Sequence, residues 1–170
     1  AAPSDDVYLD AGSVSAVITS ATGGNFENLV IDTAPATTLI SDTIDTTTVS
    51  ITGDSSVTEG ASANYTVSLS SPALSDVTVD LAYSGTAANG ADFTGVASVT
   101  IAAGASSASF SLATIDDALA EGTENFSVSI ASATGGNFEN LVVSGTNTEI
   151  GDSDTTTLNV SSPTVSENAG

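Results

Sequence analysis

Apolar and polar residues alternate along most of the chain, and a period of two is the pattern of half-buried β-strands. Turn residues separate the alternating runs, and threonine fills many outward positions, where it suits a pleated surface. Between residues 45 and 154 the pattern predicts about seven short strands, the last containing both Val142 and Ile150. The prediction is an all-β fold, an antiparallel β-sandwich of immunoglobulin-like class. The apolar residues that define these strands are Val49 and Ile51; Tyr65, Val67 and Leu69; Val77, Val79, Leu81 and Tyr83; Ala97, Val99 and Ile101; Phe110 and Leu112; and Phe126, Val128 and Ile130.

An internal repeat organises these strands. The segment Ser-Ala-Thr-Gly-Gly-Asn-Phe-Glu-Asn-Leu-Val occupies residues 20–30 and, unchanged, residues 132–142, an offset of 112 residues. Other matching stretches lie 108 to 112 residues apart. A period near 110 residues is the size of one small β-domain. We therefore expect the C-terminal part of a preceding repeat at residues 1–44, a complete repeat at 45–154, and the first strand of the following repeat at 155–170.

Residues 1–44 lack half the strands of a repeat and cannot bury their inner faces alone. Two interpretations remain open. The sequence is a segment of a longer array, or strands from another chain complete the partial repeat by β-augmentation and build a homo-oligomer. We favour the first, because the sequence starts in the middle of the repeat pattern.

The charge of the chain is entirely negative: it carries 21 acidic residues and no lysine, arginine or histidine. Without basic residues it cannot neutralise phosphates, which excludes nucleic acids and anionic membranes as partners. No stretch approaches the roughly 18 apolar residues of a membrane span, and we expect no signal peptide. The absence of cysteine, histidine and lysine removes disulfides, zinc sites and the usual nucleophiles and bases, so we expect no enzyme.

The acidic residues cluster in loops rather than spreading evenly, as at Asp116, Asp117, Glu121 and Glu124. Two carboxylates roughly 5 Å apart repel by about 1 to 3 kcal/mol, so such a loop is strained without a counter-ion. Calcium is the simplest counter-ion, because it accepts about six to eight oxygen ligands, whereas the rigid shell of magnesium resists dehydration. The alternative is that the acidic residues only keep the surface soluble.

Five motifs, in order and spacing over the whole central repeat, resemble the Calx-β domain. They are Val57-Thr-Glu59-Gly, Gly85-Thr-Ala-Ala-Asn-Gly-Ala-Asp92-Phe-Thr-Gly, Val99-Thr-Ile-Ala-Ala-Gly104-Ala-Ser, Ile115-Asp-Asp-Ala-Leu-Ala-Glu121-Gly-Thr-Glu124-Asn-Phe and Glu149-Ile-Gly-Asp152-Ser-Asp154. The lysine-free composition, rich in Ser, Thr, Ala and Asp, is also similar to the extender arrays of giant RTX-type adhesins of Gram-negative bacteria.

The resemblance implies a calcium site at one end of the sandwich, formed by acidic residues of the loops and of the segment that follows the last strand. In the complete repeat it implicates Glu59, Asp92, Asp117, Glu121, Glu124, Asp152 and Asp154, with Asp116 in a supporting role through its backbone or beside the ligands. In the preceding repeat it implicates Asp5, Asp6, Asp10, Asp42 and Asp45, with Asp10 in place of Glu121 and no counterpart of Glu124, and in the following repeat Glu167.

Residues and resemblance together predict a calcium-rigidified structural spacer of a secreted bacterial surface adhesin, with calcium ions and neighbouring repeats as its partners. Asp152 and Asp154 directly precede Thr155, where the next repeat begins, so calcium bound there would hold the angle between neighbours. The alternatives are a filament subunit assembled by strand exchange, a ligand-binding adhesin domain that grips sugar or ice, and a calcium sensor.

Overall fold

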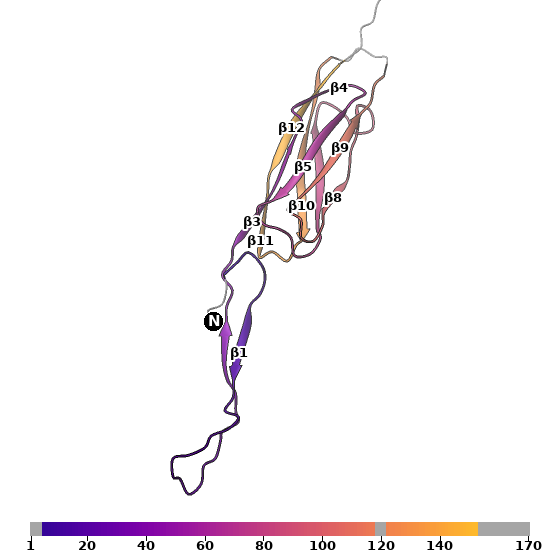
Figure 1. Cartoon of the computed structure of the whole chain (residues 1–170). Coiled ribbons are helices and arrows are strands. Elements are labelled where there is room, and N and C mark those ends of the chain that lie inside the picture. Colours follow the sequence, from indigo (N-terminus) through magenta and orange to yellow (C-terminus); the bar gives the residue numbers. More distant parts are fainter. Residues whose placement is uncertain (1–4, 118–121, 153–170) are drawn as a thin grey trace, which may run out of the picture.

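The computed structural model describes residues 5–117 and 122–152, which form a β-sandwich with a long two-stranded arm at one end (Figure 1). The described residues form strands and turns without any helix, as the alternating pattern predicts. Accordingly, no described helix has the length and hydropathy needed to cross a bilayer.

The sandwich consists of two five-stranded sheets. One has the order β4-β12-β10-β6-β8, and the other has the order β11-β3-β5-β9-β7. The strands are β3 (Thr46–Gly53), β4 (Ser56–Thr58), β5 (Ser62–Leu69), β6 (Val77–Gly85), β7 (Phe93–Thr94), β8 (Ser98–Ile101), β9 (Ser107–Thr114), β10 (Glu124–Gly135), β11 (Asn140–Val143) and β12 (Gly145–Gly151).

The last part of the repeat differs from the prediction, because Val142 and Ile150 belong to two strands of different sheets. β11 pairs with β3 in parallel, and β12 then crosses to the other sheet, where it lies between β10 and β4. Ser144 stands between the two strands, and its N–H still bonds to Val49 O, 3.1 Å away. Both strands alternate apolar and polar residues, so their pattern alone could not separate them.

Aromatic rings fill the core between the sheets. The rings of Phe93 and Phe126 stack with their centroids 4.4 Å apart, and the ring centroid of Tyr65 lies 6.4 Å from that of Phe126. The Tyr65 hydroxyl hydrogen-bonds to the buried Thr148 Oγ1, which donates to Asp54 O over 2.6 Å. This chain of bonds satisfies the hydroxyl groups of Tyr65 and Thr148 inside the core and joins the two sheets.

The arm is a hairpin of β1 (Gly12–Ala16) and β2 (Ala36–Ile40), joined by a long loop that reaches the far tip (Figure 1). Its register repeats that of β10 and β12: Gly12 pairs with Ile40 as Glu124 pairs with Ile150, and Val14 pairs with Thr38 as Phe126 pairs with Thr148. The arm therefore has the structure of the β10–β12 hairpin without the strands that cover it.

The apolar face of the arm is correspondingly exposed. Val14 is 59% exposed, whereas Phe126 at the same register position is fully buried. The contrast is sharpest within the repeated segment, where Phe26 is 67% exposed and Phe138 only 7%. Identical sequence thus acquires different burial because only the second copy has a complete sandwich around it.

This contrast in burial predicts how much the same substitution lowers the free energy of unfolding at each of the two positions. Phe138→Ala removes a buried ring and should lower the free energy of unfolding by about 3 to 5 kcal/mol. Phe26→Ala removes a ring that is largely in water and should change it by less than about 0.5 kcal/mol. Urea denaturation of the two variants measures both values, and equal losses would contradict the burial pattern.

Candidate metal centre

The arm joins the sandwich through residues 7–9, which lie beside the turn of residues 135–139. Leu9 N donates to Asn137 O over 3.1 Å, and Glu139 N donates to Val7 O over 3.2 Å. Between these bonds Tyr8 forms an antiparallel bridge with Phe138. The segment that leads into the hairpin of the arm is thus paired, residue by residue, with a turn of the sandwich.

Tyr8 anchors this contact. Its ring stacks on Phe138 with centroids 5.5 Å apart and planes 24° from parallel, and its hydroxyl donates to Pro72 O over 2.5 Å. Val7 and Tyr8 both pack against the hydrophobic core of the sandwich. Apolar contact and hydrogen bonds together therefore hold the arm where it enters the sandwich.

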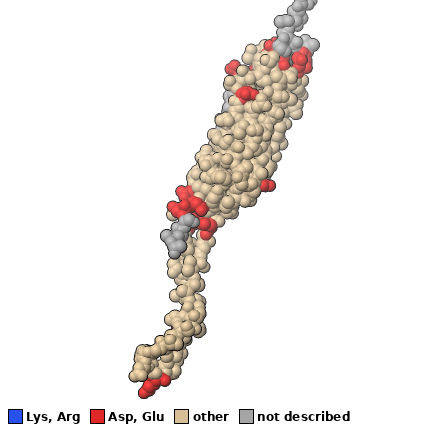
Figure 2. Space-filling view, viewed as in Figure 1, with Lys and Arg blue, Asp and Glu red and all other residues tan. Residues whose placement is uncertain are grey.

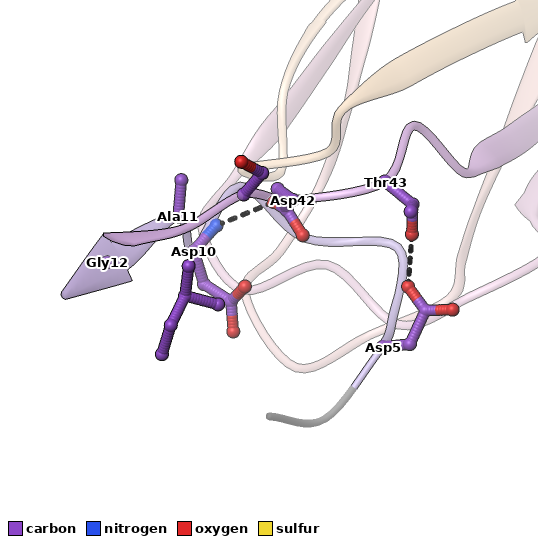
Figure 3. Close-up of a pocket in the computed structure, with 8 residues that line it drawn as sticks. Asp5, Asp10, Ala11, Gly12, Asp42 and Thr43 are labelled. Atoms are coloured by element: carbon purple, nitrogen blue, oxygen red, sulfur yellow. Dashed lines mark hydrogen bonds between the residues drawn. The ribbon is translucent and has the colours of Figure 1, made fainter. Parts of the chain in front are cut away.

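Carboxylates gather around the same contact, which we call the junction (Figure 2). A cleft of about 380 Å³ between the two sides of the arm is lined by Asp5, Asp10, Asp42 and Thr43 (Figure 3). Asp42 Oδ2 accepts a hydrogen bond from Asp10 N over 3.1 Å, and Asp5 accepts one from the Thr43 hydroxyl. One backbone N–H and one hydroxyl group thus hold carboxylates from both sides of the arm at this cleft.

Glu139 brings a further carboxylate to the junction from the sandwich side. Its Oε2 accepts a hydrogen bond from Asp45 N, while its Oε1 is buried without a hydrogen-bond partner. The Asp45 N–H lowers the pKa of Glu139, but burial, a side-chain hydrogen bond with Asp42 and the negative charges of Asp42 and Asp45 outweigh it and raise the pKa above the ordinary value. Burial, Asp42 and Asp6 also raise the pKa of Asp10.

These residues fit a calcium ion by their chemistry. All are oxygen donors, the ligand type that calcium requires, and the buried Glu139 Oε1 lacks the partner that a buried charged atom needs. Within residues 5–117 and 122–152, however, no three acidic residues lie together as a ready-made metal cage. The acids of the junction form overlapping pairs, such as Asp10 with Asp42 and Asp42 with Glu139, so binding would have to draw them closer.

The opposite end of the sandwich repeats part of this arrangement. Asp152 Oδ2 accepts a hydrogen bond from Gly122 N over 2.8 Å, two residues before β10, just as Asp42 accepts one from Asp10 N two residues before β1. Glu59 N donates to Gly151 O over 3.2 Å, which brings Glu59 beside the end of β12. The backbone therefore aligns Asp10 with Gly122, one residue later than the sequence comparison pairs it.

The remaining predicted site residues are distributed as follows. Asp116 lies against the Gly60 turn, so that the loops carrying Glu59 and Asp116 meet. Asp92 bonds within its own loop, where its Oδ2 accepts from Ala88 N over 2.5 Å. Asp117 follows Asp116 in the loop after β9, and Glu124 begins β10. Glu121, Asp154 and Glu167 lie outside the described residues.

Sequence reasoning missed Glu139 and the anchoring role of Tyr8. Both belong to the junction. Glu139 lies far in sequence from the acidic residues predicted within residues 1–44, and Tyr8, although it stands between Asp6 and Asp10, carries no carboxylate. One signal was present: an acidic residue stands at the same place, Glu27 and Glu139, in the two identical segments.

Comparisons with known proteins agree with this architecture. The LapA domain family matches residues 1–43 and 45–155. A search of curated proteins finds no match. Among solved structures, the apo form of the Calx CBD1 domain is similar with a TM-score of 0.51 and 22% identity, over 62% of this chain and 98% of that one.

Two further structures contain the same fold within longer chains. CBD12 from CALX1.2 is similar with a TM-score of 0.52 and 22% identity, over 62% of this chain and 46% of that one. The calcium binding domain CBD12 of CALX1.1 is similar with a TM-score of 0.53 and 21% identity, over 62% and 44%. The sandwich therefore has the Calx-β fold.

The raised pKa of Glu139 predicts how the stability of the calcium-free chain changes with pH. A carboxyl group whose pKa is higher in the folded chain stabilises the fold fully below its unfolded pKa, and this contribution is lost as pH rises through the folded pKa. Calcium-free protein should therefore unfold at higher denaturant concentration near about pH 4.5 than near about pH 7. Glu139→Gln cannot ionise and should weaken this dependence.

Glu27→Gln is the matched control, because Glu27 occupies the same sequence on the exposed arm. It removes the same amount of net charge but not the crowded carboxylate, so it should leave the pH dependence as in the wild type. Equal effects of the two substitutions would show that net charge alone governs the response.

Proposed function

The chain belongs to the LapA domain family, a family of large adhesins, and we propose that it is a calcium-rigidified spacer in the extended part of a secreted bacterial surface adhesin. The observation that carries the proposal is the junction, where Asp42 of the arm and Asp45 lie near Glu139 of the sandwich and Asp10 lies near Asp42. A spacer has no catalytic task, in keeping with a chain that lacks histidine, cysteine and lysine.

The proposed organisation is a tandem array. Residues 1–44 are the C-terminal part of a preceding repeat, residues 45–154 a complete repeat, and residues 155–170 the start of the next. The shared register of the arm and the β10–β12 hairpin supports this division. Each junction would then combine loops and a strand exit from one repeat with the 135–139 turn of the following repeat.

Each part of the junction has a role in this proposal. Tyr8 seats the preceding repeat on Phe138 and Pro72, and the backbone bonds of residues 7–9 set its orientation. Asp6, Asp10 and Asp42 of the preceding repeat, together with Asp45 and Glu139, would hold calcium. The bound ion supplies the positive charge that lets these carboxylates lie together, and so locks the angle at the junction.

The expected affinity is modest. Extracellular calcium modules bind with dissociation constants of about 10⁻⁴ to 10⁻³ M, and a site stabilises the folded state by about 2.7 kcal/mol when free calcium is a hundredfold above that constant. Such sites would be empty in the calcium-poor cytoplasm and filled outside the cell. Rigid spacing would therefore begin only after export.

The exposed apolar face of the arm favours a second candidate, in which another chain covers that face and builds a filament. Val14 and Ile18 are both more than half exposed although their counterparts Phe126 and Ile130 are buried. Sedimentation at increasing concentration separates the candidates, because a filament subunit assembles and a spacer segment remains monomeric.

Calcium should narrow the distribution of distances between arm and sandwich. The chain has no cysteine, so spin labels can be placed specifically at the exposed positions of S13C on the arm and T100C on the sandwich. Pulsed dipolar spectroscopy should give one narrow distance with calcium and a broad distribution with chelator. Identical distributions in both conditions would refute calcium rigidification.

Single substitutions should show that the effect of calcium on the distance between arm and sandwich arises at the junction. Asp42→Asn removes a carboxylate that faces both Asp10 and Glu139, and should reduce the calcium-dependent narrowing and the calcium-dependent rise in melting temperature. Asp80→Asn is the control, because the Asp80 side chain lies on the exposed face of β6, where its carboxylate accepts a hydrogen bond from the Ser132 hydroxyl. It should respond to calcium as the wild type does.

A further inference from the structure

The turn that receives Tyr8 occurs twice in this chain, once occupied and once free. Residues 135–139, the docking turn, carry the backbone bonds and ring stack of the junction. Residues 23–27, the free turn, have the identical sequence and lie in the loop of the arm. No described residue stacks on the Phe26 ring, which is 67% exposed, whereas Phe138 beneath Tyr8 is 7% exposed.

The free turn already holds the backbone conformation of the docking turn. Gly23, Gly24 and Asn25 have φ angles of 96°, 86° and 51°, and their counterparts Gly135, Gly136 and Asn137 have 101°, 77° and 59°. Positive φ is uncommon for residues other than glycine, although asparagine adopts it more readily than most, and its occurrence at both asparagines indicates the same turn shape. The two turns match although only the docking turn lies beside the start of β6, where Gly135 pairs with Val77.

The phenylalanine ring also takes the same place in both turns. A Cβ atom added to Gly24 would lie 2.2 Å from Phe26 Cε2, and one added to Gly136 would lie 2.4 Å from Phe138 Cε2. In each turn the ring therefore covers the second glycine. The surface on which Tyr8 stacks is preformed at the free turn, so docking there would need little reorganisation.

We propose that the free turn is a docking site for an extended Asp-Asp-Val-Tyr-Leu-Asp type of segment, that of residues 5–10, supplied by a neighbouring copy of this repeat. The occupant is identified by the docking turn, which holds such a segment in this same molecule. The segment pairs its backbone with the turn and stacks its central side chain on Phe26. Glu27 takes the place of Glu139 beside the carboxylates of the segment.

The affinity of the site should depend on which residue of the segment stands at the position of Tyr8. At the docking turn Tyr8 gives both a ring for stacking and a hydroxyl for the Pro72 carbonyl, whereas the corresponding sequence of the central repeat, residues 116–121, contains no aromatic residue. An aliphatic residue offers apolar contact but neither of the other two interactions. Junctions made with a tyrosine segment are therefore the tighter class. The inference rests on the tandem array of the proposed function, but it concerns contacts that do not depend on calcium.

Nuclear magnetic resonance of the full chain tests the site against an internal control. The probe is a capped peptide with the sequence of residues 5–10, titrated into the ¹⁵N-labelled chain in chelator at about 0.15 M salt, where charge repulsion is screened beyond about 8 Å. Amides of residues 23–27 should shift and approach saturation on the order of 1 mM, the effective concentration at which a linked neighbour would present its segment. Amides of residues 135–139 should not shift, because the arm occupies that turn.

Two variants and a second peptide complete the test. Phe26→Ala should abolish the shifts, whereas Val30→Ala, which removes a side chain that is 78% exposed on the same loop, should retain them. A peptide with serine in place of tyrosine should bind at least tenfold more weakly. Equal shifts at both turns, shifts that persist in Phe26→Ala, or no shift at either turn up to about 10 mM peptide would each overturn the proposal. None of these outcomes depends on calcium, so the proposed spacer function stands or falls separately.

Discussion

Repulsion between carboxylates is the constraint on which this structure depends, because the chain contains no basic side chain to relieve it. The fold answers by keeping the middle of the sandwich almost free of charge and by collecting acids toward its two ends and the tip of the arm (Figure 2). At the junction Glu139 lies near Asp42 and Asp45, whose carboxylates help to raise its pKa. Hydrogen bonds from backbone N–H groups hold several of these acids in place, but they supply no full positive charge.

The sandwich could be predicted from the sequence because the pattern that specifies each strand lies within that strand. Alternation of apolar and polar residues marks each strand, and the inward positions Tyr65, Leu112 and Phe126 are buried as expected. The repeat offset also relates the two strands of the arm to β10 and β12, and the structure gives both pairs the same register. Where two strands follow each other with one residue between them, as β11 and β12 do, alternation continues without a break and hides the change of sheet.

The junction was less predictable because it is assembled from distant parts of the chain. Asp10 and Asp42 could be named from their place in the repeat, yet Glu139 lies about a hundred residues away, and only the fold brings it to them. Tyr8 gave no periodic signal at all, since it lies in a loop. Its role follows from the partner it meets, Phe138, and from the Pro72 carbonyl that accepts its hydroxyl.

The parallel pairing of the sandwich's outer strands bears on how the module would carry mechanical load. β3, at the start of the repeat, runs parallel to β11, and β4 runs parallel to the final strand β12. Tension applied between the two ends of the sandwich would slide these pairs lengthwise, so that their hydrogen bonds must break together rather than one after another as in an opening hairpin. A tether built of such units would resist pulling through the geometry of its first and last strands.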